Sequence, residues 1–309
     1  MTIEPEHAPR VAVVVLDYDG LHDTLVCLQS LARSDWSELA IVVVDNASTP
    51  PVEPAVSTRF PDAIVLRTAR NLGFAGGMNV GLSRALELGA QYVLLLNNDT
   101  IVDPAMVRRL VEAAGRRPDA GILSPLVLAQ DATEPITIAS AGSQFDPRRG
   151  HPGRPLLSGQ RLDGGLTGVR EVPASSGEAM LVSADAVRQV GMLEEALYVR
   201  LEDIDWSLRM RAAGRRNYVV LDARMWHGVS RSSGGEHSPL TAYYHTRNIM
   251  FVCARHARLR RPRALAREAE VLIANLAHAR RGQRPLANAR AVIEGWRDYR
   301  GGRMGPRRA

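Results

Sequence analysis

Residues 11–17 read VAVVVLD, six apolar side chains followed by an aspartate. Two further runs share this pattern, IVVVD at residues 41–45 and VLLLNND at residues 93–99. Continuous apolar runs of this length are typical of strands that are buried on both faces, as in parallel sheets. Ligands of open parallel sheets bind outside the carboxyl ends of the strands. We therefore predict that Asp17, Asp45 and Asp99 lie along one sheet edge, where carboxylates suit a nucleotide and a divalent cation.

The rest of the chain alternates strand and helix patterns. Short strands are expected at residues 63–66, 121–125 and 218–221, and helices at residues 74–88 and 202–213. Residues 130–172 are rich in Gly, Pro and Arg and have weak periodicity, which predicts long loops or an irregular hairpin layer. This order favours an α/β fold with a mostly parallel sheet flanked by helices.

Length and charge suggest two regions. The 309 residues suffice for one large domain and an appendage. From residue 255 onward the chain is helical in pattern, with breaks near two prolines, and carries fifteen Arg against four acidic residues. We expect a catalytic domain over residues 1–254 and a basic helical C-terminal extension over residues 255–309. The extension can contact anionic lipid or a pyrophosphate-bearing acceptor, or it can be an ordinary solvated Arg face.

Nothing in the sequence indicates a membrane span or an exported protein. No apolar run approaches the roughly 18–20 residues that a span needs, and residues 1–10 lack the apolar core of a signal peptide. The two cysteines, Cys27 and Cys253, do not have the spacing of a metal site. We expect a cytoplasmic protein, with peripheral contact at the inner face of the membrane left open.

The segment NNDT, residues 97–100, is the strongest single chemical feature. A carboxylate after a buried strand, here Asp99, can hold Mg²⁺ or Mn²⁺ that bridges a diphosphate. Asn97 and Asn98 can contact ribose or phosphate without adding charge. The alternative is a plain turn after a strand.

Two other strand ends can bind a nucleoside. In DNAS, residues 45–48, Asp45 can accept from a base N–H or a ribose hydroxyl. In DYDG, residues 17–20, Tyr18 offers a flat face for a base and Asp17 an acceptor. A turn and a helix-capping Asp are the respective alternatives. The glycines of RNLGFAGGMN, residues 70–79, permit close backbone approach before a helix N-terminus, although the spacing fits neither a dinucleotide fingerprint nor a Walker A loop.

The segment EDIDW, residues 202–206, contains the candidate general base. One carboxylate here can accept a proton from an attacking hydroxyl, although acidic residues at a helix start also gain from the macrodipole. We expect Asp205 to pair with Arg209 in a structural role. His227, expected in a loop after a strand, can complete a metal shell begun by Asp99. Arg247 can meet a phosphate or a surface acid.

Taken in order, these motifs resemble the family 2 inverting glycosyltransferases of the GT-A fold. The series is most similar to the rhamnosyltransferase-like branch, in which Asn-Asn-Asp stands in for Asp-x-Asp, and it spans roughly residues 10–250. Some positions depart from the branch: Asp17 and Asp19 stand where Asn is usual, and Met78 replaces a frequent Asn. Residues 191–200 read GMLEEALYVR, in a stretch where the branch commonly has an Asp and an aromatic residue. Sugar and acceptor preferences therefore do not follow from the resemblance.

The resemblance implies a nucleoside-diphosphate sugar donor such as dTDP-rhamnose or a UDP-sugar, a divalent metal, and inversion at the anomeric carbon. It implies Asp203 as the base, with Glu202 positioning sugar or acceptor. Asp99 and His227 would bind or approach the metal. The implied donor-binding residues are Asp17, Tyr18, Asp45, Arg70, Asn71, Gly73, Asn97 and Asn98. The implied acceptor-side residues are Ser176, Gly177 and Trp206.

The acceptor would be a hydroxyl of a glycan, a lipid-linked sugar or a small molecule. We expect no nucleic-acid partner, and a homodimer is compatible with the sequence. Two other classes remain as alternatives. A sugar nucleotidyltransferase would need a Gly-rich signature with a basic residue at the first strand, where this chain has DYDG. A non-catalytic nucleotide-binding scaffold is disfavoured because Asp99, Asp203 and His227 are all present.

Overall fold

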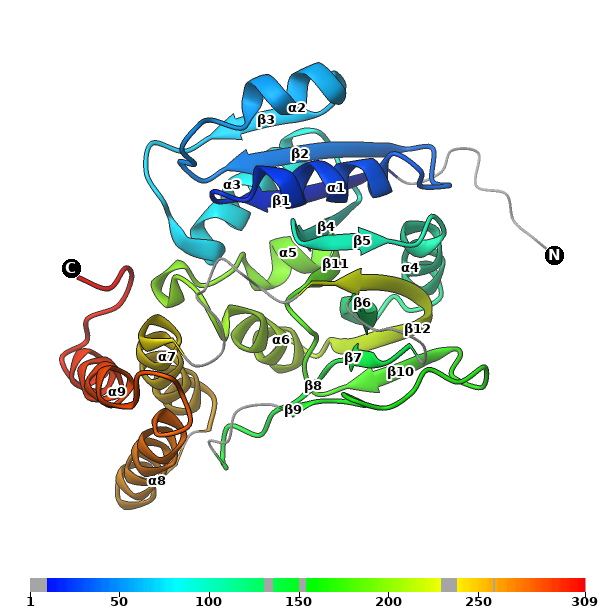
Figure 1. Ribbon diagram of the computed structural model, residues 1–309. Coiled ribbons are helices and arrows are strands. Elements are labelled where there is room, and N and C mark those ends of the chain that lie inside the picture. Colours follow the sequence, from blue (N-terminus) through cyan, green and yellow to red (C-terminus); the bar gives the residue numbers. More distant parts are fainter. Residues whose placement is uncertain (1–9, 131–135, 150–153, 229–237, 258, 309) are drawn as a thin grey trace.

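The protein is described by a computed structural model that covers residues 10–130, 136–149, 154–228, 238–257 and 259–308. Within these residues, one large sheet lies between helices, and a helical layer adjoins it (Figure 1). The helices are α1 (Leu21–Leu31), α2 (Glu53–Arg59), α3 (Gly73–Glu87), α4 (Met106–Gly115), α5 (Ala184–Val190), η1 (Glu195–Leu197, a 3₁₀ turn), α6 (Glu202–Ala212), α7 (Pro239–Ala257), α8 (Arg261–Ala279) and α9 (Pro285–Arg300).

The sheet is mixed, with a parallel half that matches the sequence prediction. Its main path runs β10-β12-β6-β11-β4-β1-β2-β3, and β5 and β7 pair off that path. The strands are β1 (Val11–Asp17), β2 (Leu39–Asp45), β3 (Ile64–Arg67), β4 (Tyr92–Asn97), β5 (Thr100–Val102), β6 (Ala120–Ala129), β7 (Ile138–Ser140), β8 (Ser143–Gln144), β9 (Arg154–Pro155), β10 (Val169–Val172), β11 (Ala179–Ser183) and β12 (Arg216–His227). β1 pairs in parallel with β2 and β4, so their carboxyl ends meet at one edge.

The apolar runs are strands buried on both faces. Val11, Val13 and Val15 of β1 pack into the cluster that contains side chains of α1, α2 and α4. Ala12 and Val14 belong to the opposite cluster, with α3, α5 and α6. A continuous apolar run is therefore required, because successive side chains of a strand point to opposite faces.

Helix α3 lies unusually close to the sheet. A Cβ at Gly81 would come within 2.2 Å of Val14 Cγ1, and one at Gly77 within 2.4 Å of Leu16 Cδ1. Only glycine allows this approach. The close packing holds the amino end of α3 next to the carboxyl ends of β1 and β2.

The sequence missed several elements. β11 was not predicted; it lies antiparallel between β4 and β6. β12 is longer than the predicted strand and includes His227, which was expected in a loop. The irregular region contains short strands β7 to β10. Helix α1 begins after Gly20, its N-cap, and Asp23 lies in its first turn.

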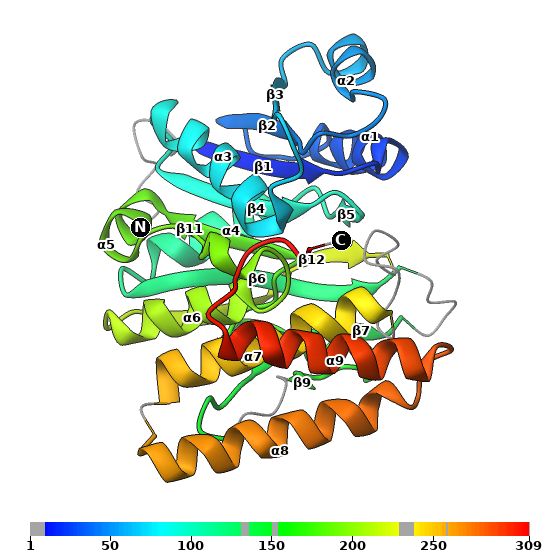
Figure 2. The same cartoon turned by 90° about the vertical axis from the view of Figure 1, so that its left-hand side faces the viewer.

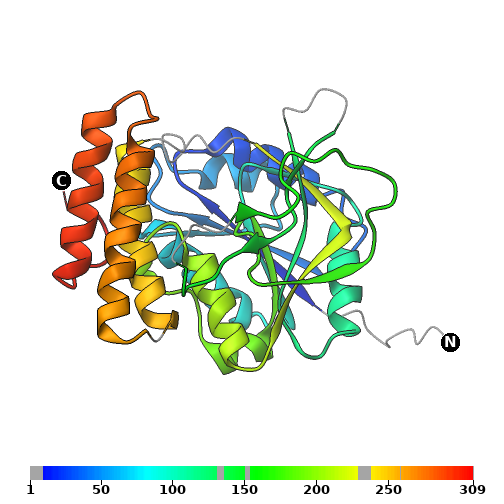
Figure 3. The ribbon, with the colours of Figure 1, turned by 90° about the horizontal axis from the view of Figure 1, so that it is seen from below.

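Helices α7, α8 and α9 form a layer at one side of the sheet. Figure 2 shows the three helices stacked below it, and Figure 3 shows them side by side at one end of the molecule. The predicted breaks are confirmed, since α8 starts at Arg261 and α9 at Pro285. After α9 the chain turns back, and Gly305 N donates to the carbonyl of Ala196 (2.8 Å). Within the described helices, none combines the length and apolarity needed to cross a bilayer.

Candidate active site

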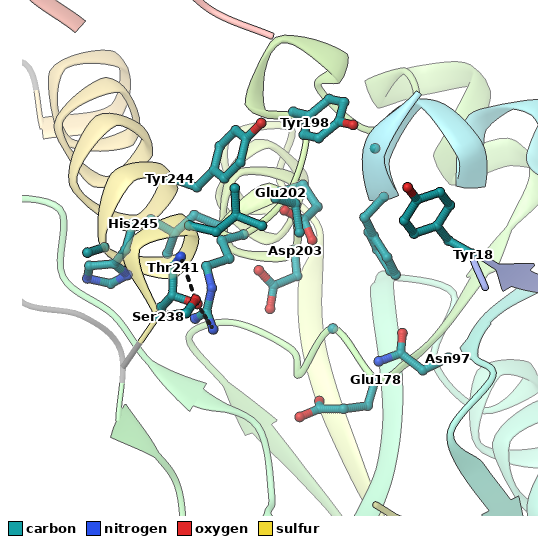
Figure 4. A pocket seen from close by; sticks show the side chains of 18 of the residues that line it. Tyr18, Asn97, Glu178, Tyr198, Glu202, Asp203, Ser238, Thr241, Tyr244 and His245 are labelled. Carbon is teal, nitrogen blue, oxygen red and sulfur yellow. Dashed lines mark hydrogen bonds between the residues drawn. The ribbon is translucent and has the colours of Figure 1, made fainter. Parts of the chain in front are cut away.

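A cavity of about 1840 Å³ opens at the carboxyl ends of the parallel strands. It extends from the β1 and β4 ends, past the start of α6, to the helical layer (Figure 4). Of the predicted site residues, those that line it are Tyr18, Asn71, Gly73, Asn97, Asn98, Asp99, Ser176, Gly177, Glu202, Asp203 and His227. The structure thus brings together side chains that are more than 200 positions apart in the sequence.

The turn after β4 presents the NNDT segment to the cavity. Asn98 Nδ2 donates to Thr24 Oγ1 (3.0 Å), which fixes its side chain against α1. Asn97 Oδ1 is buried and has no hydrogen-bond partner among the described residues. Tyr18, with 43% of its surface exposed, lies on the same rim. Asn97 and Tyr18 are therefore available to a ligand.

Asp99 and His227 face each other because β5 and β12 pair antiparallel, with Thr100 opposite His227. His227 Nε2 lies 3.1 Å from Asp99 Oδ1, but it makes no directed hydrogen bond with the described residues. Burial lowers the pKa of His227, but the Asp99 carboxylate and, to a smaller extent, Glu178 outweigh it, so the net shift is upward. The pair offers one oxygen and one nitrogen to a shared point.

These two side chains fit a divalent cation. Carboxylate and imidazole are suitable ligands for Mn²⁺, and carboxylate also for Mg²⁺. Among the described residues, no group of three His, Cys, Asp or Glu side chains could hold a metal by itself. A cation bound by Asp99 and His227 would therefore need further oxygens, which a diphosphate and water can supply.

Glu202 and Asp203 occupy the first turn of α6. Three residues just before this helix have positive φ: Tyr198 (66°), Arg200 (72°) and Leu201 (68°). Non-glycine residues rarely adopt this conformation, and strained backbone of this kind clusters at functional sites. The segment turns both carboxyl groups toward the cavity.

Burial raises the pKa of Glu202 to about 8, with the neighbouring Asp203 charge adding to the shift. Burial also raises the pKa of Asp203 to about 6, with Glu178 adding to it and backbone N–H groups opposing it. Two buried carboxyl groups this close disfavour ionising together, so the pair favours a single negative charge near neutral pH. Two carboxyl groups with separated pKa values are a common arrangement in acid–base chemistry.

Gly177 forms the wall behind the Asp203 carboxyl group. A Cβ there would lie 3.1 Å from Asp203 Oδ2 and 3.2 Å from Cγ. Ser176, 6% exposed, hydrogen bonds to Ser140. Gly177 thus fits closely against the Asp203 carboxyl group, next to Ser176.

Four predicted ligands do not line the cavity. The Asp17 and Asp45 carboxylates are fully buried and are occupied by protein donors. Asp17 accepts from Thr24 Oγ1 (2.5 Å) and Ser48 Oγ (2.7 Å). Asp45 accepts from the backbone N–H of Ser48 (2.7 Å) and from Arg67. The two acids are neighbours at the predicted edge, but they organise its loops. Burial raises the pKa of Asp45, but the backbone N–H groups of Ser48 and Val52, followed by Arg67, outweigh burial and lower it.

The other two predicted ligands outside the cavity are Arg70 and Trp206. Arg70 is exposed outside the cavity, and it is Arg67 that reaches Asp45. Trp206 is fully buried in the core, where Nε1 donates to the carbonyl of Gly191 (2.8 Å). Its ring packs against side chains of the sheet and of α3, so it faces the core. The acceptor-side assignment of Trp206 is corrected accordingly.

The structural role of Asp205 is confirmed. Its Oδ2 accepts from Arg209 Nε (2.7 Å), and its Oδ1 lies 2.8 Å from His256 Nε2. Arg247 does not line the cavity, and among the described residues it pairs with no surface acid. It is fully buried and donates to the carbonyls of Leu197 (3.0 Å) and Gly305, so it ties η1 to the C-terminal residues.

Sequence reasoning missed several cavity residues. Glu178, Tyr198, Arg200 and Tyr244 all line it, and the rings of Tyr198 and Tyr244 stack with centroids 5.4 Å apart. Glu178 directly follows the recognised Ser176-Gly177, so its position was a usable signal. The last described residues, Pro306 to Arg308, also form part of the wall. Only the three-dimensional fold reveals that contribution.

A mixed sheet with a cavity at its strand ends is the arrangement of the GT-A fold, which the solved structures described below share. The family model described as "Glycosyl transferase family 2" matches residues 12–170. The chain belongs to glycosyl transferase family 2, and the resemblance to its rhamnosyltransferase-like branch is confirmed.

Two curated relatives are similar to most of this chain. An N-acetylglucosaminyl-diphospho-decaprenol L-rhamnosyltransferase of Mycobacterium tuberculosis is 26% identical over 244 residues, covering 74% of this chain and 80% of the relative. A galactofuranosyltransferase of Mycolicibacterium smegmatis is 29% identical over 224 residues, covering 72% of each protein.

Solved structures show the same fold. GalNAc-T7 with UDP, GalNAc and Mn²⁺ has a TM-score of 0.63 at 18% identity, covering 79% of this chain and 48% of the other. A mannosyltransferase from Pyrobaculum calidifontis in complex with GDP-Man and Mn²⁺ has a TM-score of 0.58 at 18% identity, covering 96% and 84%.

Proposed function

We propose that this glycosyltransferase moves a sugar from a nucleoside-diphosphate sugar to an acceptor hydroxyl, with inversion, by a single metal-assisted displacement. The observation that carries the proposal is the shared cavity. Asp203, a carboxyl group with a raised pKa, lines the same space as the Asp99–His227 pair. A base and a diphosphate site in one cavity are the two parts that direct displacement requires.

In this proposal Asp203 takes the proton of the acceptor hydroxyl as the hydroxyl oxygen bonds to the anomeric carbon. The bond from that carbon to the diphosphate oxygen breaks on the opposite face, which inverts the centre. An ordinary hydroxyl is a poor nucleophile near pH 7, and a positioned base typically contributes about 10²–10⁴-fold. Raising the pKa of Asp203 brings its basicity closer to the working pH while leaving it mostly ionised.

Asp99 and His227 would hold the cation, which would neutralise charge on the departing diphosphate. Glu202, largely protonated near pH 7, can donate a hydrogen bond to the sugar or the acceptor. Tyr18, Asn71, Gly73, Asn97 and Asn98 line the donor end and would contact the nucleotide, with Ser176 and Gly177 toward the acceptor. Asp17 and Asp45 would act through the loops that they hold.

The relatives support a dTDP-rhamnose-like or UDP-sugar donor and an acceptor in glycan assembly. One relative is named as an L-rhamnosyltransferase that acts on a diphospho-decaprenol acceptor, and another is a dTDP-rhamnosyl transferase of Shigella flexneri. Both solved neighbours carry Mn²⁺ with a nucleotide or sugar nucleotide. The glycan, lipid-linked or small-molecule nature of this acceptor stays a prediction, as does a homodimer.

We also propose the division into a catalytic region, residues 1–254, and a basic extension, residues 255–309, that rests on the inner face of the membrane. The described part of the extension exposes Leu265 (52%), Ile273 (67%) and Leu286 (78%) among its arginines. Exposed apolar side chains beside cations suit an anionic bilayer surface. Co-sedimentation with vesicles that contain phosphatidylglycerol should exceed that with neutral vesicles, and equal binding would contradict this part.

Ligand-induced stabilisation tests the main proposal. A nucleoside diphosphate at about 100 times its Kd should add roughly 2.7 kcal/mol to the unfolding free energy. We expect UDP or dTDP to raise Tm, and to raise it further with Mn²⁺. The Mn²⁺-dependent increment should vanish in Asp99→Asn and persist in Asp35→Asn, an exposed acid outside the cavity. No shift with any nucleoside diphosphate would contradict the proposed function.

A further inference from the structure

One carboxyl oxygen of Glu178 is buried and has no donor in the part of the chain that the structure describes. This residue immediately precedes β11, and its carbonyl accepts from the backbone N–H of Asn97 (2.9 Å), which fixes it beside the NNDT turn. Its Oε2 atom is buried without a hydrogen-bond partner, and no ion pair reaches it from the described part of the chain. A buried, unpaired carboxylate oxygen is costly, so this position suits a ligand that donates hydrogen bonds.

Glu178 adjoins both halves of the proposed reaction site. It directly follows Gly177, where an added Cβ would lie 3.1 Å from Asp203 Oδ2, and its carbonyl hydrogen bonds to Asn97, two residues before Asp99. Glu178 therefore lies near both the base and the metal side. In direct displacement the transferred sugar must lie between these two points. Figure 4 shows Glu178, Asp203 and Asn97 projecting into the same part of the cavity.

A metal-binding role fits Glu178 less well. In the described residues it forms no three-member cluster with Asp99 and His227 that could hold an ion. Asn97, whose backbone N–H bonds to Glu178, has a second buried oxygen, Oδ1, that also lacks a donor among the described residues. Two acceptors without donors suit a ligand with several O–H groups, such as a sugar ring.

We propose that Glu178, together with Asn97, binds the hydroxyl groups of the transferred sugar and restricts the donor to neutral sugars. This inference rests on the proposed function, since it assigns the sugar subsite of that donor. A sugar that carries its own carboxylate would meet Glu178 and Asp203 at close range, and like charges disfavour its binding. Glu178 is thus a specificity residue for the uncharged sugar ring.

Calorimetric titration with UDP, UDP-glucose and UDP-glucuronic acid in the presence of Mn²⁺ tests this. The two sugar nucleotides differ only in a CH₂OH or a carboxylate, so their affinity ratio reports the charge preference. We expect the native protein to favour UDP-glucose by about 10-fold or more, and Glu178→Gln to reduce that ratio at least fivefold. Glu178→Ala should weaken the binding of UDP-glucose by roughly 10- to 100-fold, relative to its effect on the binding of UDP. The same titrations with dTDP and the matching dTDP-sugars repeat the test with thymine as the nucleobase.

The control is Glu87→Gln, an exposed glutamate on α3 that does not line the cavity and should leave every affinity unchanged. UDP itself should bind all variants within twofold, which excludes misfolding. Normal UDP binding with an unchanged sugar preference in Glu178→Gln would overturn this inference alone. Failure of the native protein to bind UDP and dTDP would overturn the proposed function, and this inference with it.

Discussion

Replacing Gly177 by alanine should damage catalysis without removing any functional group. The new Cβ would lie 3.1 Å from Oδ2 of Asp203 and 3.2 Å from both its Cβ and its Cγ. These contacts are several tenths of an ångström tighter than ordinary packing, so the Asp203 side chain must move. A displacement of about 1 Å can cost 10²-fold in rate. We therefore expect kcat to fall roughly 10-fold, with a stability cost of about 1 kcal/mol from overpacking.

The assay is donor turnover under saturating acceptor, combined with calorimetric titration of the nucleoside diphosphate. Binding of the nucleoside diphosphate should change less than twofold, because Gly177 faces the base. The matched control is Gly115→Ala at the end of α4, where an added Cβ meets nothing within 4 Å. That variant should keep full activity and gain about 0.4–1 kcal/mol in stability. Unchanged kcat in Gly177→Ala would refute the placement of Asp203 as the base.

Other predictions follow from the same geometry. Turnover should rise with pH around 6 as Asp203 loses its proton. It should decline near pH 8, where Glu202 ionises and no longer donates a hydrogen bond. In a pH–rate profile, Glu202→Gln should abolish only the alkaline decline. Asp99→Asn should raise the Mn²⁺ concentration required for half-maximal turnover at least 10-fold, as measured by metal titration. Asp205→Asn should destabilise the fold by about 3 kcal/mol in urea unfolding, because Arg209 and His256 lose a buried partner. The His256 and Arg209 contacts outweigh burial and lower the pKa of Asp205, so its stabilisation should be present above about pH 4 and be lost as the pH falls further.

The parallel half of the sheet was predictable because its signal is local. Each of β1, β2 and β4 is a continuous apolar run, and a strand buried on both faces requires such a run. β11 has a similar run, Ala179 to Val182, but nothing in it specifies an antiparallel direction. Strand direction and order depend on long-range pairing, which periodicity does not encode.

The site shows the same contrast. Asp99, Asp203 and His227 were predicted from ordered motifs, and all three line one cavity. For Asp17 and Asp45 the strand ends were correct, but the direction of the carboxylates depends on where Ser48, Thr24 and Arg67 place their donors. Side-chain partners from distant segments are not visible in the sequence.

Asp203→Asn tests the central claim, a carboxylate base opposite a diphosphate site. We predict a loss of turnover of about 10²-fold or more, with affinity for the nucleoside diphosphate and Mn²⁺ within twofold of the native protein. The variant should be at least as stable at pH 8, since a carboxyl group whose pKa rises on folding destabilises the fold once it is ionised. Native turnover in a correctly folded Asp203→Asn protein would contradict the account.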